Sequence, residues 1–274
     1  MSDPSFELPE PDPLVWEELK PFLDPMHSML GFSEQVISDI RNQKASVGGL
    51  ENVKTLAVYF FLKTTSLGRS LWLLAGHGNP IAASIVARSI AEADIQLRFV
   101  FYEGLRTAEL RAEEFFTYLR FRKREELQRL LETAIKDGDT DWAKKLKKTL
   151  KSVKAEFKNR KHTDYWPHRK IDDLAKCVGY SFYHKGVYSP LSGYVHDSFD
   201  LFMYIRNQNP AAWETGRSTK DLDHRIIVFC EAYAHITEVL YGVHWNRSFQ
   251  THDRFQDAIT EMKRLSLRDR GRSD

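Results

Sequence analysis

Two charged side chains interrupt an apolar stretch in the first third of the chain. Arg88 and Glu92 are four residues apart, so on a helix they lie one turn apart on the same face. The same face carries apolar side chains: Ile81, Ile85, Ile95 and Phe99. Buried charges are almost always paired, and a buried pair adds little stability, so the pattern favours a functional role for Arg88 and Glu92. An ion pair that fixes the register of the helix accounts for the same pattern.

A second polar group lies much later in the chain. Tyr188, Ser192 and His196 have the spacing Y-x3-S-x3-H, and Ser189 followed by proline predicts a helix over residues 190–206. Ser192 and His196 then lie one turn apart on one face. Because the unperturbed pKa of histidine is close to neutrality, a half-buried histidine with a hydroxyl neighbour can act as a general base or acid. A core histidine satisfied by hydrogen bonds is the structural alternative.

A strongly basic stretch lies between these two groups. From Lys144 to Lys161 there are nine Lys or Arg residues and a single acid, Glu156. Such a face can contact the phosphates of a nucleic acid. The candidate phosphate-binding residues are Lys147, Lys151, Lys154 and Lys158. The alternative is the solvated outer face of a helical hairpin.

Other common chemistries have little support, and we expect neither a cofactor nor a metal. His224, Glu231, His235 and Glu238 share one helical face, but they lie opposite the apolar stripe and lack the Glu-x-x-His spacing of di-iron bundles. We therefore expect a solvated face there. The sequence contains no G-x-x-x-x-G-K-[ST] loop and no G-x-S-x-G elbow, and neither cysteine has a C-x-x-C partner.

The elements that must position these residues are helices. Apolar residues recur at spacings of three and four from Val53 to Leu74, and Asn79 followed by Pro80 is a good N-cap with a first-turn proline. The helix expected over residues 80–103 has two opposed apolar stripes, so it should be central. No alternating strand pattern of useful length appears, and the predicted fold class is all-α.

The chain divides into a single domain with two flexible ends. We expect a Pro-rich leader over residues 1–14, one domain of about seven to eight helices over residues 15–264, and a flexible tail over residues 265–274. Two helices around the turn at residues 136–140 predict a protruding basic hairpin over residues 106–161.

Composition limits the class of protein. Of the 274 residues, 42% are hydrophobic and 28% charged, with two cysteines and a formal net charge of +2. These values exclude a disordered, collagen-like or disulfide-stapled chain. The longest apolar runs, such as residues 57–62 and 226–230, are much shorter than the roughly 18 residues of a membrane helix. The acidic, proline-containing N-terminus differs from a secretory signal, so we expect a cytoplasmic protein without a membrane partner.

The two motifs together resemble a known family. The stretch from Gly78 to Glu92, with the later Y-x3-S-x3-H, is similar over residues 50–205 to an all-helical bacterial family of unknown function. Its members carry an R-S-x-x-E helix, a Y-x3-S-x3-H helix and an intervening tryptophan, here Trp166. The resemblance implies that five side chains converge on one site: Arg88, Glu92, Tyr188, Ser192 and His196. It also implies a place in mobile or defence-associated bacterial loci, and the long helices are similar to the ribonuclease domains of helical toxins and antiviral effectors.

Two functions follow as expectations. The first is a metal-independent ribonuclease or nucleotide-directed hydrolase, in which His196 exchanges a proton with a ribose 2′-hydroxyl and Arg88 stabilises the charge that develops on the phosphate. The R-x4-6-H motif of helical ribonucleases occurs here only as chance-level matches at residues 217–224 and 247–252, so this function requires Arg88 and His196 to meet in space. The second is a non-catalytic helical module that forms a homo-oligomer or binds a partner protein.

Overall fold

The chain is helical in the part that the structure describes. The structure is a computed structural model, and it describes residues 12–42, 50–154, 165–193, 219, 221–245 and 252–270. Within these ranges helices are joined by turns and no strand occurs, which confirms the all-α fold class.

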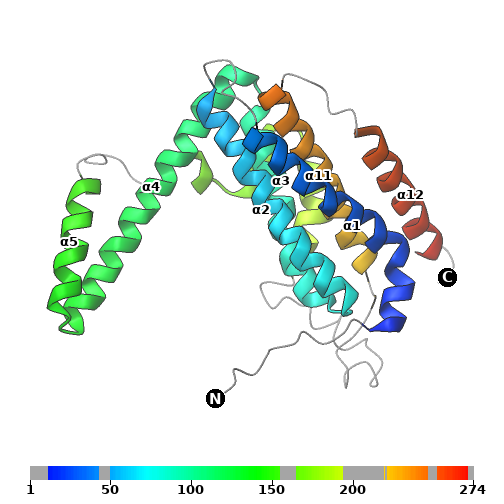
Figure 1. The fold of residues 1–274 in the computed structure, drawn as a ribbon, viewed down its shortest axis with the longest axis horizontal. Helices are drawn as coiled ribbons and strands as arrows, with labels where there is room; N and C mark the ends of the chain where they lie inside the picture. Colours follow the sequence, from blue (N-terminus) through cyan, green and yellow to red (C-terminus); the bar gives the residue numbers. More distant parts are fainter. Residues whose placement is uncertain are drawn as a thin grey trace.

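Three helices form the centre of the bundle. α2 (Glu51–Gly76), α3 (Pro80–Phe101) and α11 (Leu222–Trp245) pack against one another (Figure 1). Buried side chains lie on several faces of α3. The central position predicted from its two opposed apolar stripes is therefore confirmed. Ile85, which the pattern assigned to one stripe, is exposed instead.

The start of α3 is set by local sequence. The Asn79 side chain accepts a hydrogen bond from the backbone N–H of Ala82 at 3.1 Å, and Pro80 occupies the first helical position. Gly78 has a φ of 65°, a conformation that glycine adopts readily, and it reverses the chain between α2 and α3. The helix start predicted at Asn79 and Pro80 is therefore confirmed.

α2 and α11 approach each other closely at Gly68. A methyl group added to Gly68 would overlap the ring of Phe229 on α11. Phe229 is completely buried, so its ring has no free space into which to move. The close packing of these two helices therefore requires glycine at this position.

Two further helices cover the outside of α11. α1 (Pro13–Asn42) packs on α2 and α11, and α12 (His252–Arg270) packs on α11 and α1 (Figure 1). The hydroxyl of Ser266 is buried and donates a hydrogen bond to Asp223 on α11. The flexible tail expected from residue 265 is therefore wrong at its start, because this part of the chain packs as helix.

The basic region forms the predicted hairpin. α4 (Leu105–Lys136) and α5 (Thr140–Lys154) lie antiparallel, and the distal half of α4 projects with α5 from the bundle (Figure 1). Their contact is a small apolar cluster of its own: Leu127, Ala134, Ala143, Leu146 and Leu150. Gly138, with a φ of 75°, makes the turn between them. α4 extends to Lys136, the first residue of the turn predicted at residues 136–140.

Five short helical pieces follow: η3 (Trp166–His168), α6 (Ile171–Cys177), α7 (Ser181–Tyr183), η4 (His184–Tyr188) and α8 (Ser189–Gly193). α6, η4 and α8 pack against α3, η3 packs on α4, and α7 packs on α6 and η4. The last three follow one another without a break.

η4 is a π-helical turn, in which the Ser189 N–H bonds to the carbonyl oxygen of His184. Ser189 has helical backbone angles, with φ −63° and ψ −45°, so it does not cap a helix. The start predicted at this serine is therefore wrong. Pro190 supplies no backbone N–H for a helical hydrogen bond. The π-helical turn lies directly before this proline, and the helix that begins at Ser181 continues through it. Residues 194–206 of the expected helix lie outside the described residues.

α11 is long and apolar enough to cross a membrane by length and composition alone, with a mean hydropathy of 1.4. The expectation from uninterrupted apolar runs missed this helix, because Glu231 breaks the run. Of the most apolar stretch of α11, 61% is buried inside the bundle. A helix in the core of a bundle passes the same test, and α11 packs on α2 and α3 as such a helix does.

Candidate functional site

The structure brings two of the five predicted site residues into direct contact. Arg88 of α3 donates a hydrogen bond from Nη2 to the hydroxyl oxygen of Tyr188 at 3.0 Å. Its guanidinium carbon also lies 5.3 Å from the centre of the Tyr188 ring. The ring of His184 also stacks on Tyr188, with the ring centres 5.1 Å apart. Tyr188 is buried and Arg88 half-buried, so the pair lies at the edge of the core.

Arg88 does not form the ion pair with Glu92 that its spacing suggested. Within the described ranges, its one hydrogen-bond partner is the neutral phenol of Tyr188, and its Nε–H is buried without an acceptor. The intrahelical ion pair between Arg88 and Glu92, considered as a device to fix the helix register, is therefore wrong, whereas an ion pair with another helix stays an untested alternative. An N–H of a guanidinium left without an acceptor is unfavourable, and an anionic oxygen is the group that would satisfy it best.

Glu92 lies in a separate position on the same helix. It is half-buried, and its carboxylate accepts only a long contact of 3.5 Å from Gln96. Lys63 on α2 lies close enough to Glu92 for the two charges to interact. Burial lowers the pKa of Lys63, and the carboxylate of Glu92 offsets part of that shift. Lys63 and Glu92 are therefore charge neighbours across the contact of α2 with α3, and no described contact joins either of them to Arg88.

Lys63 was not among the residues predicted from sequence. Its only signal is that it ends the apolar run at residues 57–62. A lysine at the end of an apolar run is common on any amphipathic helix. Its proximity to Glu92 depends on the packing of α2 against α3, which the sequence does not show.

The remaining predicted residues are placed in part. Ser192 is half-buried on α8, one turn after Tyr188, and α8 packs against α3. His196 lies outside the described residues. Trp166, the tryptophan that the resemblance placed between the motifs, is buried against Phe99, about 16 Å along α3 from Arg88. Its indole N–H bonds to the carbonyl oxygen of Arg111 at 2.8 Å, so its role is to join α3 to α4.

The basic face is separate from Arg88. Lys147 and Lys151 are exposed on α5, the side chain of Lys154 is not described, and Lys158 lies outside the described residues. Among the described elements, α5 packs extensively against α4 alone. Therefore the lysines of α5 and the site around Arg88 are two surfaces that no described packing joins.

α3 carries a second polar network, which was not predicted from the sequence. The carboxylate of Asp94 is 2% exposed, and it accepts hydrogen bonds from Nε of Arg98 at 3.0 Å and from Nδ1 of His235 at 2.6 Å. The solvated face expected for the α11 residues is wrong at His235, whose side chain is only 20% exposed. Asp94 and Arg98 repeat the i, i+4 spacing of charges in an apolar helix, and this repetition is the signal that could have found the network.

Two tyrosines complete this network. Arg98 lies over the ring of Tyr180, 4.3 Å from its centre, and Tyr180 stacks on Tyr183 at 4.6 Å. Burial, with a smaller contribution from the Asp94 carboxylate, raises the pKa of Tyr180 to about 12. Burial likewise holds the pKa of Tyr183 well above its ordinary value. The network therefore fixes the chain that leads to Tyr188 against α3 and α11.

No metal centre is evident in this part of the chain. Within the described ranges, no group of three or more His, Cys, Asp or Glu side chains is arranged to hold a metal ion.

The central part of the chain matches a known protein family. The profile of a family of unknown function, DUF5677, matches residues 54–212. The chain belongs to the DUF5677 family. No curated protein and no solved structure matches it.

The DUF5677 match contains α2 from residue 54 onwards and all of α3 to α8, and with them Lys63, Arg88 and Tyr188. α11 lies outside the match, although it is a central helix of the bundle and supplies His235 to the Asp94 network. The family segment of this protein is therefore packed around a helix that follows it in the chain.

Proposed function

We propose that this protein acts on RNA or on a nucleotide, and that Arg88 binds a phosphate group of that substrate. One observation carries the proposal: Arg88 is half-buried, has a neutral hydrogen-bond partner, and keeps a buried Nε–H without an acceptor within the described ranges. The planar fork of a guanidinium matches the oxygens of a phosphate, and hydrogen bonds between charged groups are about twice as strong as neutral ones. Lys63 on α2 lies near Glu92, which is one turn along α3 from Arg88.

The proposed reaction is acid–base cleavage without a requirement for a metal. His196 accepts the proton of a ribose 2′-hydroxyl, the freed oxygen attacks the adjacent phosphorus, and the bond from phosphorus to the 5′-oxygen breaks. A proton returns to that leaving oxygen, and the products are a 2′,3′-cyclic phosphate and a 5′-hydroxyl. Arg88 stabilises the extra negative charge on the phosphorus centre, and Tyr188 holds the guanidinium in place. The exposed lysines of α5 attract the polyanion.

The test is incubation of the purified full chain with mixed RNA, with DNA and with nucleotides, in the presence and absence of a chelator. Arg88→Gln and His196→Gln should each reduce cleavage by about 100-fold or more, with the melting temperature unchanged within a few degrees. Arg106→Gln is the matched control, because Arg106 is exposed on α4. Equal loss in this control, or full activity in His196→Gln, would remove the assignment.

The same experiment separates the second candidate. If the wild-type protein neither cleaves nor binds any of these substrates, the non-catalytic module that oligomerises or binds a partner protein remains. The polar residues around Arg88 would then be a structural network, and Arg88→Gln would lower stability without any loss of activity to measure.

A further inference from the structure

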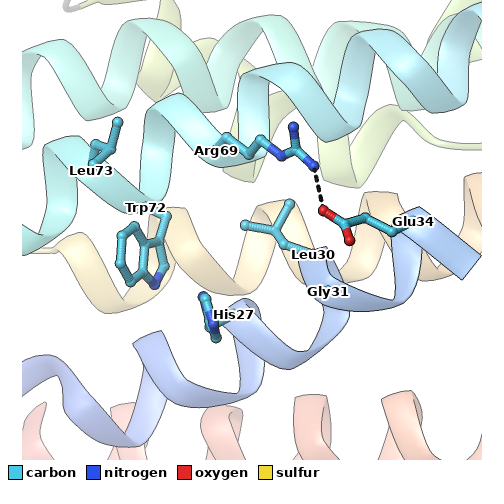
Figure 2. Close-up of a pocket in the computed structure, with 7 residues that line it drawn as sticks. All are labelled: His27, Leu30, Gly31, Glu34, Arg69, Trp72 and Leu73. Carbon is cyan, nitrogen blue, oxygen red and sulfur yellow. Dashed lines mark ion pairs between the residues drawn. The ribbon is translucent and has the colours of Figure 1, made fainter.

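A pocket of about 370 Å³ lies between α1 and α2 (Figure 2). None of its lining residues belongs to the site around Arg88. Four of them lie on α1 and three on α2: His27, Leu30, Gly31, Glu34, Arg69, Trp72 and Leu73. Its volume falls within the range of small-molecule sites, and its lining combines apolar, aromatic and charged side chains as such sites do.

Trp72 gives the pocket a hydrogen-bond donor without a partner. Its Nε1 is buried and has no acceptor among the described residues. The nitrogen lies on the edge of the indole that faces His27 (Figure 2), and the two rings are 5.4 Å apart with an angle of 35° between them. Trp16 contacts Trp72 edge-on at 5.1 Å and holds its orientation. A buried N–H without an acceptor is unfavourable, and a ligand acceptor would relieve it.

Gly31 keeps the pocket open. It lies in the middle of α1, where glycine is about 1 kcal/mol less favourable than alanine. No steric reason requires glycine there, because an added Cβ would meet no atom within 4 Å. The missing side chain instead leaves free space at the wall of the pocket, where a larger residue would occupy it.

An available cation lies at the end of the pocket opposite Trp72. Arg69 pairs with Glu34 at 3.7 Å, and the side chains are 57% and 80% exposed (Figure 2). Such an exposed and long ion pair contributes little, so an anion could replace Glu34 as the partner of Arg69 at small cost. The pocket therefore offers an aromatic wall and a neutral donor at one end and a cation at the other.

We propose that this pocket binds a small planar heteroaromatic molecule with an anionic substituent, for which a mononucleotide is the simplest probe. The planar ring takes the place of the exposed His27 ring beside Trp72, so that a ring acceptor reaches the otherwise buried Trp72 N–H, and the anion reaches Arg69. This inference goes beyond the function proposed for Arg88, since it uses a different face of the protein and different helices.

The experiment is calorimetric titration of the full chain with adenosine monophosphate, adenosine and inorganic phosphate. Gly31→Leu fills the pocket and should weaken binding of adenosine monophosphate at least about tenfold, with an equal or higher melting temperature because leucine favours helix. Gly242→Leu is the matched control. Gly242 is an exposed helical glycine with no atom within 4 Å of its added Cβ. Gly242→Leu should therefore bind adenosine monophosphate as the wild type does. Trp72→Phe should weaken binding about 3-fold to 10-fold through loss of one hydrogen bond.

The titrations are repeated in Arg88→Gln, which removes the phosphate contact proposed for the other site. In this background adenosine monophosphate should still bind, adenosine should bind more weakly, phosphate alone should give no saturable heat, and Gly31→Leu should remove the binding that remains. The inference is overturned if Arg88→Gln binds no adenosine monophosphate, if phosphate alone binds Arg88→Gln as tightly as the nucleotide does, or if Gly31→Leu leaves the binding in this background unchanged.

Discussion

Arg88 and Tyr188 are 100 residues apart in the chain, yet the guanidinium donates a hydrogen bond to the phenol oxygen at 3.0 Å. This bond links α3 to the turn that carries the second sequence motif. It also holds Arg88 away from Glu92, one turn along its own helix. Within the described ranges no carboxylate forms an ion pair with Arg88, so its charge is not neutralised by one there.

Tyr188→Phe removes the acceptor of Arg88 and should lower the free energy of unfolding by about 1–3 kcal/mol, because a partly buried N–H loses its partner. Phosphate-dependent activity should fall as well, since the guanidinium is no longer held. Chemical denaturation and RNA cleavage of the same protein measure the two effects. A variant with native stability and native activity would show that the bond contributes to neither.

Glu92→Gln should change the free energy of unfolding by less than about 1 kcal/mol, because this half-buried carboxylate has no short ion pair in the described part of the chain. It should lower the pKa of Lys63 further, since the Glu92 carboxylate is what partly offsets the effect of burial. Reductive methylation of the lysines followed by NMR titration reports this pKa. A loss of about 3–5 kcal/mol would instead indicate a buried ion pair.

Reversal of the hairpin charges tests the basic face. If Lys147, Lys151, Lys154 and Lys158 contact phosphates, binding of nucleic acid should weaken steeply as salt rises, and the fourfold change to Glu should abolish it. The fold should remain, since Lys147 and Lys151 point into solvent. Lys20→Glu with Lys170→Glu, two exposed lysines elsewhere, is the control. Unchanged binding by the hairpin variant would assign these charges to solubility.

The buried tyrosines predict alkaline behaviour. Burial raises the pKa of Tyr180 from 10.0 to about 12 in the folded protein. Between these values the unfolded chain has lost a proton that the folded chain retains, so stability is complete below pH 10 and declines as the pH rises further. Absorbance titration near 295 nm should show a class of tyrosines that ionise late, and Tyr180→Phe should reduce its amplitude. Ionisation of every tyrosine near pH 10 in the folded protein would contradict the packing around Arg98.

Gly68→Ala should lower the free energy of unfolding by about 1–3 kcal/mol, because the new methyl group overlaps the Phe229 ring in a closely packed interface. Phe229→Leu in the same chain should restore part of the loss by making room. Thermal unfolding of the single and double variants gives the coupling between the two positions. Simple additivity would show that α2 and α11 can separate at this point without strain.

Helix ends could be predicted from the sequence where the signal depends only on neighbouring residues. The cap at Asn79 and the proline after it are completed by atoms within one turn, so the start of α3 could be predicted. The same type of signal failed at Ser189, because the preceding turn is π-helical and the helix continues through Pro190. The end of α12 was missed for a related reason, since Ser266 is ordered by Asp223 on another helix.

The candidate site was predictable only as a set of unusual residues. Charges in apolar helices identified Arg88 and Glu92, but not that Arg88 would bond to Tyr188 rather than to its neighbour on the helix. His235 was assigned to solvent because its partner, Asp94, is 141 residues away. Periodicity describes one helix at a time, and the partners of buried polar groups are contributed by other helices.

The π-helical turn at residues 184–188 sets the direction of the side chains that follow it. Relative to an α-helix, such a turn contains one surplus residue, so every side chain after it is rotated by about 100°. Loss of a single residue here would preserve helix, hydropathy and composition, yet would direct Ser192 to another side of the helix. The length of this short segment therefore determines the direction of Ser192 relative to the residues before the turn.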